Sequence, residues 1–124
     1  VTALPLISRA QSGLVTGGSY YVAVTDVGDI IGAGGWTQRR GAPGFGDVRH
    51  LVTDDRQIRR GVGRAIMAAA HDQARSASVR LMDCKATRTA EPFYAAMGYR
   101  RLGEITVALR AGISFPAVQM QRRL

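Results

Sequence analysis

The segment RQIRRGVGRA, residues 56–65, has the most specific local pattern in this chain of 124 residues. It follows an alternating, strand-like stretch from Asp47 to Thr53 and precedes an amphipathic helix expected from Gly61 to about Ala77. Glycines at such a helix start let unpaired backbone N–H groups face an anion, which the helix dipole also attracts. Three arginines add full positive charge around the turn: Arg59, Arg60 and Arg64.

Several interpretations compete for this turn. A Walker A loop requires lysine and a hydroxyl residue after the last glycine, whereas arginine and alanine stand there. A dinucleotide fingerprint requires a third small residue where Ile66 stands, although Asp83 lies at the expected distance. A third interpretation is a site for the pyrophosphate arm of coenzyme A. Alternatively, Gly61 and Gly63 only permit a tight entry into the helix.

Composition sets limits on the class of protein. The 17 basic and 9 acidic residues give a net charge of +8, which favours an anionic partner. Nucleic acid is the weaker choice, because the arginines are spread along the chain and no nucleic-acid-binding module matches. The only cysteine, Cys84, cannot form an intrachain disulfide, so a reducing, cytoplasmic setting is expected. No apolar run approaches the ~18 residues of a membrane span, so no membrane partner is expected.

The order of predicted elements indicates one mixed α/β (α+β), three-layer domain over residues 1–124. Residues 1–18 are poorly defined, with at most a short helix. Thr89 is expected to cap the second helix, which Gly98 ends. The expected elements are a hairpin over 20–36, a loop over 37–46, a strand over 47–53, a helix over 61–77, a strand over 79–86, a helix over 89–98 and a hairpin over 105–120.

Two segments carry a family resemblance. The stretch ATRTAEPFYAAMGY, residues 86–99, is similar to a signature Asn-x-x-Ala-x-x-Phe-Tyr-x-x-x-Gly-Phe, with Thr87 replacing the asparagine. Residues 58–63 resemble a pyrophosphate motif Gln/Arg-x-x-Gly-x-Gly/Ala, with Ile58 in its first position. Both motifs belong to the GNAT superfamily of acetyl-CoA-dependent N-acyltransferases. The resemblance covers about residues 20–124.

The resemblance implies a central, mostly antiparallel sheet flanked by helices. The residues before Tyr20 are too few for the family's first strand and first helix, which are therefore expected to be missing or reduced. Either the chain is truncated or it is a pared-down member. A second copy pairing along an exposed sheet edge could complete the missing wall, so a homodimer is a further expectation.

The resemblance also implies the residues that bind acetyl-CoA. The backbone at Leu51, Val52 and Thr53 would pair with the pantetheine arm, and Thr87 and Phe93 belong to the second motif. The expected pyrophosphate contacts are Ile58, Arg59, Arg60, Gly61, Val62, Gly63 and Arg64.

Acetyl transfer to an amine needs a polarised carbonyl, a base and a proton for the departing thiolate. By the resemblance, Tyr94 is the general acid; without the motif it would be an aromatic packing a short helix. Asp47 and His50 are candidate bases, with a water-relayed or absent base as the alternative. A strand amide near Val52 would polarise the carbonyl. No metal is predicted, because the histidines and Cys84 lack ligand spacing.

The expected function is transfer of an acetyl group from acetyl-CoA to a primary amine of a small molecule or protein, by direct attack on the thioester. Acceptor specificity would lie in the loops over 37–46 and 110–116. The alternatives are a catalytically silent domain that binds coenzyme A for regulation or interaction, and a basic nucleic-acid-binding module.

Overall fold

The computed structural model describes residues 6–10, 18–53 and 61–124. Their elements follow in the order β1 (Leu6–Ala10), β2 (Gly18–Val24), β3 (Ile30–Arg39), β4 (Ala42–Thr53), α1 (Val62–Ser76), β5 (Leu81–Ala86), α2 (Glu91–Ala96), β6 (Arg100–Arg110) and β7 (Ile113–Arg123).

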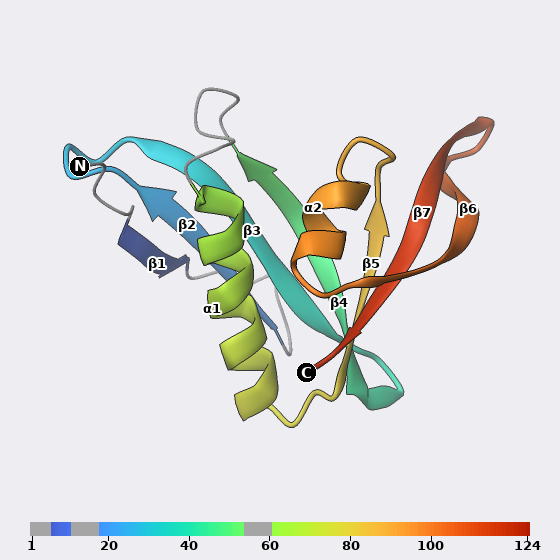
Figure 1. The fold of residues 1–124 in the computed structure, drawn as a ribbon, viewed down its shortest axis with the longest axis horizontal. Helices are drawn as coiled ribbons and strands as arrows, with labels where there is room; N and C mark the ends of the chain where they lie inside the picture. Colours follow the sequence, from blue (N-terminus) through green and yellow to red (C-terminus); the bar gives the residue numbers. More distant parts are fainter. Residues whose placement is uncertain (1–5, 11–17, 54–60) are drawn as a thin grey trace.

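Within the described residues, the strands form one seven-stranded sheet in the order β1-β2-β3-β4-β5-β7-β6 (Figure 1). All neighbouring pairs are antiparallel except β4 and β5, which are parallel. A parallel pair needs a long crossover connection, and α1 lies in that connection. The mixed, mostly antiparallel sheet predicted from the sequence is therefore confirmed.

The parallel pair is short. Residues of β4 and β5 face each other only from Phe45 and Leu81 to Asp47 and Asp83. Beyond these residues the two strands diverge, with α2 in front of the opening (Figure 1). From Val48 onward, the side of β4 that faces β5 therefore has no ladder partner in β5.

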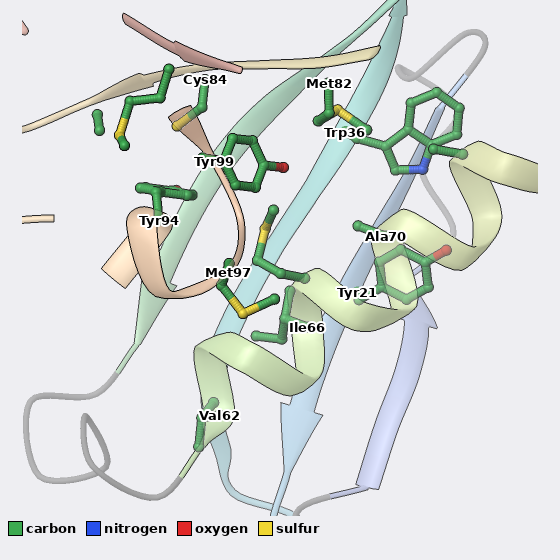
Figure 2. Close-up of a cluster of buried hydrophobic side chains, with 14 of the residues drawn as sticks. Tyr21, Trp36, Val62, Ile66, Ala70, Met82, Cys84, Tyr94, Met97 and Tyr99 are labelled. Atoms are coloured by element: carbon green, nitrogen blue, oxygen red, sulfur yellow. The ribbon is translucent and has the colours of Figure 1, made fainter. Parts of the chain in front are cut away.

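Both helices lie on one face of the sheet, so the described residues form two layers and the expected third layer is absent from them. Gly34 lets α1 and the end of β4 pack closely, since a Cβ there would lie 2.8 Å from Leu51 and 3.3 Å from Ile66. The buried side chains of α1 and of the α2 region share one core, in which Trp36 is the largest member (Figure 2).

Two further sequence predictions are wrong. The expected loop over 37–46 is the tip of a hairpin: β3 runs to Arg39 and β4 starts at Ala42, joined through Gly41 at a φ of 78°. The N-terminal segment, where at most a helix was expected, contains strand β1 paired with β2. Strand β1 is five residues long.

Candidate active site

A cleft occupies the opening between β4 and β5. It consists of two cavities, of about 290 and 220 Å³, that share Leu51, Thr87, Ala90 and Tyr94 in their linings. The first cavity is completed by Gly63, Thr89 and Phe93. The second is completed by Val48, Cys84, Lys85 and Ala86. The cleft therefore extends from the start of α1, along β4, to the aromatic side chains of α2.

A β-bulge shapes the β4 wall. Ala33 pairs with Val52 but Gly35 pairs with Arg49, so two residues of β4 stand opposite one residue of β3. Under strict alternation, Val48 and Leu51 would lie on opposite faces of the strand. The extra residue puts both against the core and the cleft.

The N-terminus of α1 lies at one end of the cleft. Gly61 is its N-cap and has a φ of 74°, a left-handed conformation that glycine adopts without strain. Gly63 lines the cleft, whereas the Val62 side chain is fully buried in the core, which leaves only its main chain for a ligand. Arg64 is exposed. No acidic side chain occupies the first turn, and the N-cap has no side-chain hydrogen bond.

The loop before α2 forms another wall. The Ala90 N–H donates to Oγ1 of Thr87 at 3.2 Å, so this hydroxyl orders the turn. The N-cap of α2 is Ala90 and no side chain caps it, so the predicted cap at Thr89 is wrong. Glu91 supplies the acidic residue in the first turn, and Pro92 follows where no intrahelical donor is lost.

Tyr94 lies at the meeting point of both cavities with only 6% of its surface exposed (Figure 2). Its ring makes edge contacts with Phe93 and Tyr99, at centroid distances of 5.1 and 5.4 Å. Burial raises the pKa of the phenol well above its usual value, and the adjacent Cys84 raises it further. Burial likewise raises the pKa of the Cys84 thiol to about 12. Both groups therefore keep their protons at neutral pH.

Asp47 lies away from the cleft. It is 9% exposed and does not line either cavity. Arg39 binds its two carboxylate oxygens at 2.6 and 3.3 Å, and also approaches Asp83 at 3.6 Å. The structure thus separates Asp47 from Tyr94 and places it in an ion-pair cluster.

The structure describes only some of the remaining predicted site residues. Val52 is 61% exposed on β4, paired with Ala33. His50 and Thr53 belong to β4, but their side chains fall outside what the structure describes. Ile58, Arg59 and Arg60 lie outside the described residues.

The sequence is covered by the family profile of the acetyltransferase (GNAT) domain from residue 7 to residue 124. The chain belongs to the GNAT acetyltransferase family. No curated protein gives a significant sequence match.

Solved structures of GNAT and other acetyltransferases have the same fold. Nourseothricin acetyltransferase is 26% identical, with a TM-score of 0.74 over 86% of this chain and 65% of its own. The IAA acetyltransferase from Bacillus cereus is 14% identical, with a TM-score of 0.75 over 96% and 99% of the two chains. A probable acetyltransferase from Staphylococcus epidermidis is 13% identical, with a TM-score of 0.77 over 90% and 71%.

This GNAT domain also has residues in the cleft that sequence reasoning missed as site residues. They are Val48, Cys84, Lys85, Ala86, Thr89 and Ala90. Ala90 is part of the quoted signature and could have been found. Val48, Cys84, Lys85 and Ala86 line the cleft because β4 and β5 diverge beyond Asp47 and Asp83, which leaves no local sequence signal. Thr89 lines it from the loop before α2, at a position that the signature leaves open.

Within the described residues, no group of three or more His, Cys, Asp or Glu side chains could hold a metal ion. In the same part of the chain, no helix has both the length and the apolar character needed to cross a membrane.

Proposed function

We propose that this GNAT domain transfers an acetyl group from acetyl-CoA to a primary amine. The observation that carries the proposal is one cavity with Gly63, at the N-terminus of α1, at one end and Tyr94 at the other. This arrangement suits a ligand that has phosphates at one end and a reactive group at the other. Family membership supports acyl transfer, and the cleft supports the choice of donor.

The residues present fit such a donor. The first N–H groups of α1, which have no partner within the helix, favour phosphate, and no acidic side chain in the first turn opposes it. Arg64 adds an exposed positive charge there, and Arg59 and Arg60 are proposed to add more. Beyond Asp47, the side of β4 that has no ladder partner in β5 would offer backbone groups to an amide-containing arm, at Leu51, Val52 and Thr53. Thr87 and Phe93 would flank this arm from the side of α2.

The bound thioester supplies an activated acetyl group: a C–N bond to the amine forms, the C–S bond breaks and sulfur leaves as a thiolate. Tyr94 would act on that thiolate as a hydrogen-bond donor, because its raised pKa keeps the phenol protonated at neutral pH and makes full transfer of its proton to a thiolate unfavourable. A backbone N–H of β4 near Val52 would polarise the carbonyl. Cys84 is unsuited to act as an acyl-carrying nucleophile, because its thiol also stays protonated.

The proton released by the amine needs an acceptor. Asp47 would have to give up part of its ion pair with Arg39 to take it. We therefore put His50, on the same strand, ahead of Asp47 as the base, with a water-relayed path as the alternative.

Substitution of Tyr94 tests the proposal. Tyr94→Phe should lower turnover by about a hundredfold or more while acetyl-CoA affinity changes less than about twofold. Turnover is measured as release of free thiol over a panel of amines that includes nourseothricin, and affinity by calorimetry. Tyr21→Phe is the matched control, since this buried tyrosine of β2 lines neither cavity.

A silent domain is the second candidate, because no described helix covers the sheet face opposite α1 and α2. Wild-type protein that binds acetyl-CoA but releases no thiol with any amine would favour it. Absence of acetyl-CoA binding would refute both candidates, and unchanged turnover in Tyr94→Phe would remove Tyr94 from the mechanism.

A further inference from the structure

Tyr94 lies on α2, a helix of six residues whose N-cap makes no side-chain hydrogen bond. Helices this short depend on tertiary packing for their order. Two rings contact Tyr94 edge-on, and they differ in where they lie: Phe93 lines the cleft, whereas Tyr99 lines neither cavity and is 4% exposed. Figure 2 shows Tyr99 beside Tyr94. Tyr99 is therefore the contact of Tyr94 on the side of the core.

Tyr99 is anchored through both its main chain and its side chain. Its N–H donates to the carbonyl oxygen of Tyr94 at 3.0 Å. Its hydroxyl oxygen lies 2.7 Å from Nε2 of His71 on α1, and the two rings are 5.7 Å apart at an interplanar angle of 34°. Because the hydroxyl is at the far end of the ring, this hydrogen bond restricts the orientation of the ring that contacts Tyr94.

Arg122 of β7 fixes His71 in turn. Its NH1 donates to Nδ1 of His71 at 2.9 Å. A guanidinium only donates, so Nδ1 accepts and the proton of the neutral ring is on Nε2, from which it is donated to Tyr99. Gly98 makes room for Arg122: it has a φ of 90°, and a Cβ there would lie 3.3 Å from Nε of Arg122. The hydrogen bonds thus run from β7 through α1 to the ring that contacts Tyr94.

We propose that Tyr99 is a positioning residue for Tyr94, and that His71 and Arg122 hold Tyr99 in place. The proposal rests on the proposed function, in which Tyr94 donates a hydrogen bond to the departing thiolate. Such a donor stabilises developing charge only when its distance and direction are fixed beforehand. Tyr99, His71 and Arg122 line neither cavity of the cleft, so their effect on the reaction passes through Tyr94.

A double-mutant cycle between positions 94 and 99 tests the proposal. Tyr99→Phe keeps the ring and removes its anchor, so kcat should fall about threefold to tenfold while KM for acetyl-CoA changes less than about twofold. In the Tyr94→Phe background, which lacks the donor, the same substitution should change kcat by less than about twofold. A merely structural role would lower kcat by the same factor in both backgrounds. Tyr21→Phe, at a buried tyrosine outside the cleft, is the matched control and should leave kcat unchanged.

Substitution of His71 gives a second readout. Glutamine keeps an N–H for Tyr99 and an oxygen for Arg122, whereas leucine keeps neither. His71→Leu should therefore lower kcat as Tyr99→Phe does, and His71→Gln should restore part of that loss. Neither change should add to the effect of Tyr99→Phe, because all three act through the same contact. Urea denaturation of each variant identifies the conditions under which it is folded, and kcat is compared there.

An unchanged kcat in Tyr99→Phe, or equal losses in both backgrounds, would overturn the positioning role and leave the role of Tyr94 intact. An unchanged kcat in Tyr94→Phe would refute the role of Tyr94 and the positioning role with it. Calorimetry of acetyl-CoA binding to the wild type reports on the donor site independently of both. A failure of the proposed function and a failure of this inference are therefore distinguishable.

Discussion

His71 makes the stability of the protein sensitive to acid. It lies on α1, is 2% exposed and hydrogen-bonds through both ring nitrogens. Arg122 can only donate, so Nδ1 must accept, and the proton of the neutral ring is on Nε2, 2.7 Å from the hydroxyl oxygen of Tyr99. Burial, together with the charges of Arg122 and Arg75, lowers the pKa of His71 to about 4, against a smaller opposing effect of Asp72.

The size of this stability loss follows from the difference between the pKa of His71 in the folded state and its pKa in the unfolded state. The unfolded chain takes up a proton near pH 6.5, whereas the folded protein does so only near pH 4. As the pH falls between these values, the unfolded state binds more protons and the free energy of unfolding decreases. Each unit of pKa difference corresponds to about 1.36 kcal/mol, so His71 should account for a loss of about 3 kcal/mol by pH 4.

Urea denaturation at several pH values between 7 and 4 measures this loss. His71→Gln is expected to be less stable at pH 7 but to lack the contribution of the histidine to the pH dependence. The difference in unfolding free energy between wild type and variant should therefore shrink by about 3 kcal/mol across the window. His50→Gln, which removes the other histidine, is the control and should keep the dependence. A constant difference, or a His71 pKa near 6.5 by NMR, would refute the reasoning.

Two further predictions concern the sheet. Gly35→Ala would place a Cβ 2.3 Å from a backbone oxygen of β2, so we expect a loss of about 1–3 kcal/mol or more in urea denaturation. Gly44→Ala, with no atom within 4 Å of the new Cβ, should cost less than about 0.5 kcal/mol; equal losses would contradict the steric argument. Asp83→Ala leaves the amides of Gln119 and Gln121 without their acceptor and should lower the unfolding free energy by about 1–3 kcal/mol, whereas an unchanged urea midpoint would show that these hydrogen bonds contribute nothing.

The sequence predicts the elements in which apolar residues recur at regular helical spacing or in runs separated by turn residues. The helical spacing of Val62, Ile66 and Ala69 predicted α1 within a residue or two at each end. The β2–β3 and β6–β7 hairpins were predicted because turn residues separate apolar runs. The two motifs, over residues 58–63 and 86–99, predicted site residues that line the 290 Å³ cavity: Gly63, Thr87, Phe93 and Tyr94.

The sequence could not predict features that depend on distant partners. The ion pair between Arg39 and Asp47 forms because β3 and β4 continue as a hairpin through a stretch rich in glycine, which indicates a loop locally. The exclusion of Asp47 from the cleft follows from that pairing. The placement of β1 at the sheet edge likewise depends on β2, since its five residues carry little signal of their own.

The bulge in β4 limits how the cleft can change. Side-chain substitutions at Leu51 or Val48 alter the shape and polarity of the wall, but they leave the strand register as it is. Strict alternation of the same residues, with no bulge, would instead turn Leu51 away from the core. In engineering terms, the lining can be retuned by point mutation, whereas the bulge decides which residues of β4 face the cleft.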